Sequence, residues 1–380
     1  LVADDAIDNA GELTLAVTFQ TQSVTEESVE LTDTVRAREV QFSSDGPCET
    51  QQPGILRCTG TLNALDYRGD DGVIGVADRF APRAVALGVT AWIPDEPGPH
   101  QSVIFGHGLG GDREQAQFLA DQVVSPQSGT KSAVIAPDAP FHGTHPDCAG
   151  RSCPDLLTFF GFDISSLPLR FEGHRFRDNL RQANLDKQHI VNAILGGLDV
   201  DDDGVDDFAS DGIHYVGGSL GGIMGGEFVA MTPELDTVSL IVPGARLIDV
   251  IREIDAAPVL FGLPSAGELA RLYPILQSSF DQGDPGAFAG HILFDRVRGT
   301  DAERPHLLMQ VALGDAIVPN RTSVFFARTL RLPVVGDEIV PVPGSERITQ
   351  FPVRLNLENS TTTGFYGFDV ICADDNCEST

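Results

Sequence analysis

The first 85 residues alternate polar and apolar positions over short stretches. The segments GELTLAVTFQTQSV (residues 11–24) and SVELTDTVRAREVQF (28–42) show this most clearly. A period of two residues is typical of strands that bury one face, and no part of the region shows convincing helical spacing. We therefore expect a β-rich N-terminal region over residues 1–85.

From about residue 86 onward, short apolar runs alternate with longer amphipathic stretches. The runs predict strands at 84–94, 100–108, 131–140, 212–218, 237–245 and 306–315, and the amphipathic stretches predict helices at 112–124, 175–197 and 220–231. Short, continuous apolar runs are typical of strands in a buried parallel sheet. The alternation predicts an α/β fold over residues 86–380, with a mostly parallel sheet and helices on both faces.

Residues 246–304 interrupt this alternation. The stretch IDVIREIDAAPVLFGLPSAGELARLYPILQSSF is apolar, prone to form helices and punctuated by proline. We expect a helical insertion there that forms a cap over a site, with additional helices of the main body as the alternative.

Charge and hydropathy argue against a nucleic-acid-binding protein and against a membrane-spanning protein. The chain has 380 residues and a formal net charge of −30. Such a negative field repels nucleic acid, so no nucleic-acid partner is expected. No apolar run reaches the roughly 18 residues that a membrane helix needs, so no transmembrane segment is expected.

The six cysteines fall into three local pairs, Cys48 with Cys58, Cys148 with Cys153 and Cys372 with Cys377. Six cysteines allow about 15 pairings, of which the local one is the simplest. Zinc is disfavoured because no C-x-x-C occurs and no histidine stands at ligand spacing. Disulfides persist in oxidising compartments, so we expect a secreted, periplasmic or cell-surface protein.

The stretch HYVGGSLGGIMGG (214–226) carries the strongest chemical signal. Gly217-Gly218-Ser219-Leu220-Gly221 fits G-x-S-x-G, a predicted strand precedes it and a predicted helix follows. A sharp turn between strand and helix needs small neighbours around an exposed serine. This context indicates that Ser219 is a nucleophile.

With this motif, residues 86–330 resemble the α/β-hydrolases, and in particular secreted bacterial esterases and lipases with GxSLGG. The resemblance implies an oxyanion hole made by two backbone N–H groups. The first donor would be the backbone N–H of Leu109, in FGHGLGGDREQ (105–115), and the second would be that of Leu220. His107 would be structural, and the APDAPFHGTHP motif (136–146) would follow the first crossover helix.

The same resemblance makes Asp315, in VALGDAIVPN (311–320), the acid that orients a catalytic histidine. The family order is serine, acid, histidine, but no histidine follows Asp315 in this sequence. Three explanations stay open. The sequence stops short of the histidine; another histidine serves, with His291, His142 and His145 the candidates; or the protein is a non-catalytic relative.

The acidic stretch DVDDDGVDDFASD (199–211) resembles a calcium-binding loop of the EF-hand type. The expected ligands at positions 1, 3, 5, 7 and 9 are Asp199, Asp201, Asp203, the carbonyl of Val205, and Asp207. Position 12 departs from the pattern, because it is Ser210 and not a bidentate acid. We expect structural calcium, with a solvated acidic turn as the alternative.

These features together predict a serine hydrolase that cleaves small-molecule or lipid esters through an acyl-enzyme on Ser219. No cofactor is expected for catalysis. An amidase or peptidase of the same fold and a non-catalytic binding protein are the alternatives.

Overall fold

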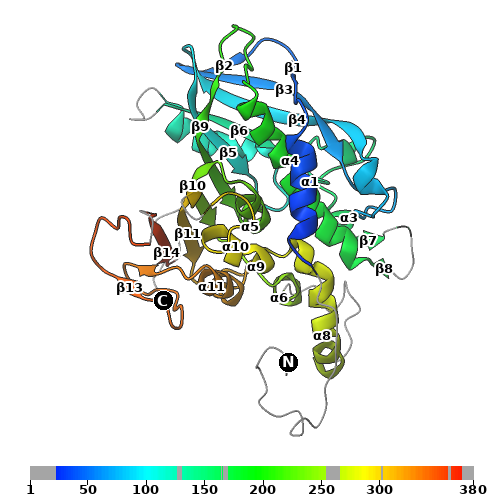
Figure 1. The fold of residues 1–380 in the computed structure, drawn as a ribbon, viewed down its shortest axis with the longest axis vertical. Helices are drawn as coiled ribbons and strands as arrows, with labels where there is room; N and C mark the ends of the chain where they lie inside the picture. Colours follow the sequence, from blue (N-terminus) through cyan, green and yellow to red (C-terminus); the bar gives the residue numbers. More distant parts are fainter. Residues whose placement is uncertain are drawn as a thin grey trace, which may run out of the picture.

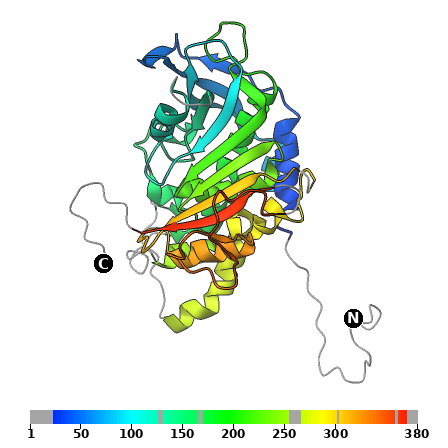
Figure 2. The same cartoon turned by 90° about the vertical axis from the view of Figure 1, so that its left-hand side faces the viewer.

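The computed structural model describes residues 23–125, 131–163, 165, 170–253, 266–300, 303–357 and 361–369. Its centre is one twisted, twelve-stranded sheet (Figures 1 and 2). In spatial order along the sheet the strands are β1 (Phe42–Ser44), β3 (Ile55–Asp66), β4 (Arg83–Pro94), β6 (Ser132–Pro137), β5 (His100–Gly106), β9 (Phe208–Gly218), β10 (Leu235–Ile241), β11 (His306–Ala312), β14 (Thr363–Phe368), β12 (Val334–Val335) and β13 (Arg347–Ile348), with β2 (Glu49–Gln52) paired to β3.

The sheet is parallel from β6 to β13 and antiparallel at its N-terminal edge, where β1, β2, β3 and β4 pair. The parallel strands β5, β6, β9, β10 and β11 are apolar runs of the sequence, in nearly the predicted places, whereas the parallel strands β12, β13 and β14 were not predicted. Because the N-terminal strands join the same sheet, the described part of residues 1–85 is continuous with the body. The division at residue 85 stays a prediction.

Helices cover both faces of the sheet. On one face, Val103 and Phe105 of β5 pack with Ala120 of α2 (Gln117–Val123). On the other, Ile104 packs in the main core with Ile190 of α4 (Gly173–Leu195). The same core includes residues of α5 (Leu220–Met231) and α11 (Asn320–Thr329). Alternate residues of one strand thus supply two cores, as a parallel sheet buried on both faces requires.

Residues 26–36 correct the expectation that the N-terminal region contains no helix. They form α1 (Glu26–Arg36), which lies beside α4 (Figure 1). The buried residues of α1 are Ser28, Leu31, Thr32 and Val35. These residues have helical spacing, but two of them are polar. The hydrophobic pattern of the sequence therefore resembled the polar–apolar alternation of a strand.

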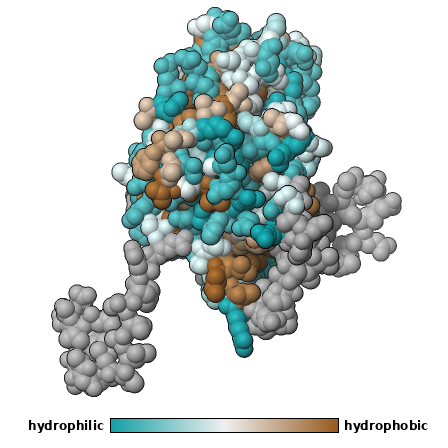
Figure 3. Space-filling view, turned by 90° about the vertical axis from the view of Figure 1, so that its right-hand side faces the viewer, coloured by the Kyte–Doolittle hydropathy of each residue, from teal (hydrophilic) through white to brown (hydrophobic). Residues whose placement is uncertain are grey.

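The region between β10 and β11 is helical, as predicted. It contains α6 (Leu247–Glu253), α8 (Ala266–Phe280), α9 (Pro285–Phe288) and α10 (Gly290–Leu293). Helix α8 projects from the body (Figure 2) and exposes Leu272 and Ile275, and Figure 3 shows hydrophobic surface at this end of the molecule. Whether residues 246–304 act as a cap stays a prediction.

Three further short elements lie between β6 and α4. They are α3 (Leu156–Phe159) and the two-stranded pair β7 (Phe162–Asp163) and β8 (Arg170–Phe171). Across the described ranges, no helix is both long and apolar enough to span a bilayer.

Two of the three expected disulfides are present, Cys48–Cys58 and Cys148–Cys153. Cys372 and Cys377 lie outside the described residues.

Candidate active site

Ser219 stands at the turn between β9 and α5, at the carboxyl edge of the parallel sheet. Its φ and ψ are 51° and −112°, a conformation that is costly for a residue with a side chain. A hydrogen bond to the neighbouring strand fixes the turn, because the Ser219 N–H donates to the carbonyl of Ile241 at the end of β10 (2.8 Å). The strained strand-to-helix turn predicted from the sequence is therefore present.

Glycines make this turn possible. A Cβ on Gly221 would lie 2.0 Å from the carbonyl oxygen of Gly106, at the end of β5. A Cβ on Gly217 would lie 2.5 Å from the carbonyl oxygen of Gly221. Both distances are far below van der Waals contact, so α5 approaches the sheet closely only because these positions lack side chains.

A small cavity of about 40 Å³ opens at Ser219. Leu109 and Leu220, the two expected oxyanion donors, also line it. Neither backbone N–H is hydrogen-bonded to a residue that the structure describes, and Leu220 is the first residue of α5, where helix amides are free. The structure thus brings together three of the predicted site residues around one cavity.

The remaining walls of the cavity are apolar. They are formed by Phe160, Phe176, Ile223, Leu247, Val250, Ile251, Ile317 and Val318. Three of these residues belong to α6, and two follow Asp315. Apolar walls exclude water and strengthen any electrostatic interaction inside the cavity.

His107 fixes the loop that carries Leu109. Its Nε2 accepts a hydrogen bond from the Ala139 N–H (2.9 Å), and its Nδ1 therefore donates to the Gly108 carbonyl (2.9 Å). Burial lowers the pKa of His107 to about 4, so the ring is neutral at pH 7. The structural role expected for His107 matches these contacts.

Gln115 also holds this loop, and sequence reasoning missed it. Its side-chain carbonyl accepts a hydrogen bond from the Gly108 N–H (3.0 Å). The sequence does not indicate this role for a polar residue in the short helical turn Arg113–Ala116, because the contact with Gly108 forms only in the folded loop.

Asp315 lies in the turn after β11. One carboxylate oxygen accepts hydrogen bonds from the N–H groups of Ile317 (2.8 Å) and Val318 (2.9 Å). Asp315 itself does not line the cavity, but Ile317 and Val318 do. The turn therefore connects the expected acid to the wall of the Ser219 cavity.

All nine histidines lie in the described ranges, and none of them is hydrogen-bonded to Ser219. His145 is unsuited to act as a base, because its ring lies within 3.2 Å of both Asp147 and Asp186. Burial alone would lower the pKa of His145, but hydrogen bonds and charges from these two carboxylates raise it to about 9. His145 is a charged, buried member of an ion network.

His142 and His291 each have one ring nitrogen with no hydrogen-bond partner among the residues that the structure describes. His142 donates from Nδ1 to the Pro140 carbonyl (2.8 Å), and its buried Nε2 has no partner in the described part of the chain. Its ring packs against that of His107, with the centroids 5.2 Å apart. His291 lies elsewhere, where Nδ1 donates to the Asp295 carbonyl (2.7 Å).

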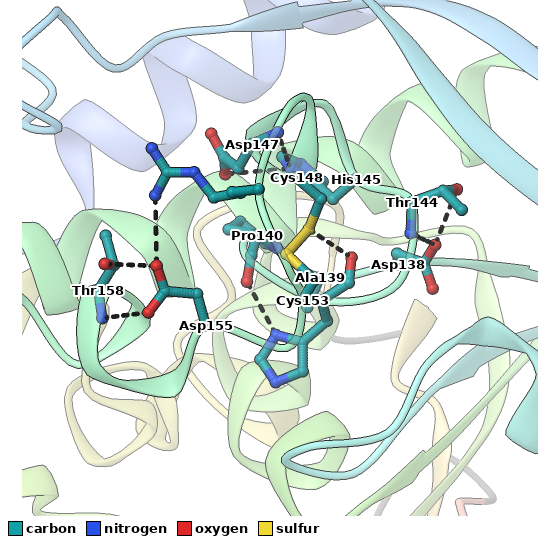
Figure 4. The surroundings of a disulfide bond; sticks show 12 residues. Asp138, Ala139, Pro140, Thr144, His145, Asp147, Cys148, Cys153, Asp155 and Thr158 are labelled. Atoms are coloured by element: carbon teal, nitrogen blue, oxygen red, sulfur yellow. Dashed lines mark hydrogen bonds and ion pairs between the residues drawn. A yellow bond between two sulfur atoms is a disulfide. The ribbon is translucent and has the colours of Figure 1, made fainter.

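The loop between β6 and α3 holds His142 and His145 and is tied down at several points (Figure 4). The Cys148–Cys153 disulfide closes one part of it. Asp138 stabilises the part of the loop before the disulfide, since its carboxylate accepts hydrogen bonds from the N–H groups of Thr144 (2.7 Å) and Arg113 (2.8 Å). The loop is therefore a fixed support beside the site.

The acidic loop brings together only some of the expected calcium ligands. Carboxylate oxygens of Asp199, Asp201 and Asp207 lie within 4.8 Å of one another. Burial and the neighbouring acids raise the pKa of Asp207 to about 7. Asp203 is not in this group and accepts a hydrogen bond from the Val205 N–H (2.7 Å). The calcium site stays a prediction.

No family model matches the sequence, and no curated protein matches it. Solved structures do match. An acetyl xylan esterase from Paenibacillus sp. is 14% identical, with a TM-score of 0.53, over 87% of this chain and 88% of that chain. Acetyl xylan esterase 1 from Thermoanaerobacterium sp. is 14% identical, with a TM-score of 0.49, over 90% and 88%. At this identity the likeness establishes the fold alone, and this chain has the α/β-hydrolase fold.

Proposed function

We propose that the protein is a serine hydrolase that cleaves carboxylic esters. One observation carries the proposal: Ser219 is held in a strained turn at an apolar cavity that Leu109 and Leu220 also line, and neither of their backbone N–H groups is hydrogen-bonded to a described residue. In this proposal the Ser219 Oγ attacks the ester carbonyl, the alcohol leaves, and water then releases the acid from the acyl-enzyme.

The N–H groups of Leu109 and Leu220 would stabilise the negative oxygen that forms during both steps. Removing one donor from an oxyanion hole typically costs roughly 2.7–4 kcal/mol of transition-state stabilisation. His107 and Gln115 support this function indirectly, because both hold the Gly108 backbone next to Leu109.

A base must accept the Ser219 proton, since a neutral hydroxyl is a poor nucleophile. The acid of the site would be Asp315. Among the described residues no histidine is hydrogen-bonded to its carboxylate, which accepts from the Ile317 and Val318 N–H groups. Among the histidines of this chain, His142 is the one to test as the base, because its Nε2 is unpartnered and its ring lies against His107. His145 is disfavoured by its two carboxylate partners.

The cavity supports a short, apolar acyl group. Its open volume is about 40 Å³, and every lining residue except Ser219 is apolar. A structure of the same fold is an acetyl xylan esterase, which agrees with a small acyl group. We therefore propose acetyl esters in preference to long-chain lipid esters as substrates, with no cofactor required for catalysis.

We further propose that the protein works outside the cytoplasm, either secreted or in the periplasm. The two disulfides support this setting, because such bonds persist in oxidising compartments.

Matched 4-nitrophenyl esters and 4-nitroanilides of acetate, butyrate and octanoate test the proposed activity. We expect hydrolysis of the acetate ester at the highest kcat/KM and at least a hundredfold slower cleavage of the anilides, with Ser219→Ala inactive on all of them. Faster anilide cleavage would indicate an amidase. Absence of turnover for every substrate would support a non-catalytic binding protein.

A further inference from the structure

A second, larger cavity lies near that of Ser219, since the adjacent residues Arg246 and Leu247 line one cavity each. It has a volume of about 880 Å³ and lies where the start of α1 meets α8, α9, α10 and α11 (Figure 1). Among the described residues, none lines both cavities. Its size is within the usual range for ligand sites, and its walls are mostly polar.

One fixed dipeptide separates the two cavities. Arg246 lines the large one and Leu247 lines that of Ser219. Both N–H groups donate to the buried carboxylate of Asp284, at 2.9 and 2.6 Å. Arg246 has φ of 61°, an uncommon value for a residue with a side chain, so this wall is held in place by Asp284.

The free groups in the large cavity are mainly hydrogen-bond acceptors. Gln277 uses its amide nitrogen on Asp281 (3.0 Å) and Asp284 (2.9 Å), and its buried side-chain oxygen has no partner among the described residues. His291 donates through Nδ1 to Asp295, which leaves Nε2 as an acceptor. Glu26 adds an exposed carboxylate.

The aromatic side chains at this cavity are not free to hold an organic cation. The Arg246 guanidinium lies over the rings of Tyr273 (5.6 Å) and Phe325 (5.2 Å), and its Nε is paired with Asp249 (3.0 Å). The arginine therefore occupies the aromatic faces that would otherwise attract an ammonium group, and it adds a fixed positive charge to the wall.

An anion is also a poor match, because three carboxylates, those of Glu26, Asp281 and Asp284, line the same cavity. A neutral ligand with many O–H donors can donate hydrogen bonds to Gln277 and His291, and it is repelled neither by Arg246 nor by the carboxylates. Val24 and Ala287 supply apolar surface for the C–H face of such a molecule. We propose that this cavity binds a polyhydroxylated, uncharged ligand, namely one or two sugar rings.

Isothermal titration calorimetry of the full chain tests this site, with maltose, cellobiose and xylobiose as probes. We expect saturable binding of at least one disaccharide. Asp281→Asn and His291→Phe should each weaken it at least tenfold, without a change in the circular dichroism spectrum. Ser219→Ala should bind as the parent chain does, because the site does not depend on ester hydrolysis.

Three results would overturn the proposal. The first is the absence of saturable binding for all three disaccharides. The second is equal binding by the parent chain and both cavity variants. The third is a preference for spermidine or inorganic phosphate over the sugars, since this would assign the cavity to a charged ligand.

Discussion

The backbone N–H of Leu313 donates to the carbonyl of Phe368 at 2.8 Å. This bond places the end of β14 beside the turn that carries Asp315, since Phe368 is the last residue of β14 and Leu313 follows β11 directly. The carboxyl ends of the two strands and the expected catalytic acid therefore meet at one edge of the sheet, where ligands bind in parallel α/β sheets.

Asp315→Asn should reduce kcat on the acetate ester on the order of 10³-fold or more, because an amide does not hold an imidazole in its working tautomer. The variant should fold normally, since an asparagine side-chain oxygen can still accept from the Ile317 and Val318 N–H groups. Steady-state kinetics and a melting curve measure both effects. Retained activity in a well-folded variant would remove Asp315 from the mechanism.

Gly221→Ala should destabilise the protein by several kcal/mol, because the new Cβ would lie 2.0 Å from the Gly106 carbonyl oxygen. Gly218→Ala is the matched control: nothing lies within 4 Å of its Cβ, so its free energy of unfolding should change by less than about 1 kcal/mol. Urea unfolding curves compare the two. Equal stabilities would show that α5 does not approach β5 this closely.

The buried ion network makes stability depend on pH. The folded-state pKa of His145, about 9, is above the ordinary value, so its stabilisation is complete below pH 6.5 and is lost as the pH rises through 9. Compared with His145→Gln, the parent chain should lose on the order of 3 kcal/mol of unfolding free energy between pH 6 and pH 9.5. Parallel curves for the two proteins would contradict the charged state of His145.

Calcium should stabilise the acidic loop if Asp199, Asp201 and Asp207 hold it. We expect 1 mM Ca²⁺ to raise Tm by roughly 2–8 °C over the value in EGTA. Asp201→Asn should abolish the shift. Asp202→Asn should preserve it, because Asp202 is outside the cluster and asparagine tolerates its φ of 63°. Identical melting curves with and without Ca²⁺ would favour a solvated turn.

The central strands and the serine turn could be predicted because their signals are local. The apolar run 212–218, the glycines around Ser219 and the stretch 220–231 each specify their own backbone. Helix α5 begins and ends at the predicted residues.

Helix α1 could not be predicted because two of its buried residues, Ser28 and Thr32, are polar, and the partner of Ser28 is distant in the sequence. Ser28 donates to the buried carboxylate of Glu227 (2.7 Å), which is 199 residues away. For the same reason α4, expected to bury one apolar face, also buries Arg181, whose partners include Glu27 (2.8 Å). Hydrophobic periodicity carries no information about such pairs.

Labelling with a fluorophosphonate tests the central claim most directly, because this probe reacts with an activated serine. Intact-mass spectrometry before and after treatment, followed by peptide mapping, measures the number and position of adducts. We predict one adduct, on Ser219, that is lost in Ser219→Ala and slowed in Asp315→Asn. An unmodified Ser219 in folded protein would contradict the serine hydrolase mechanism.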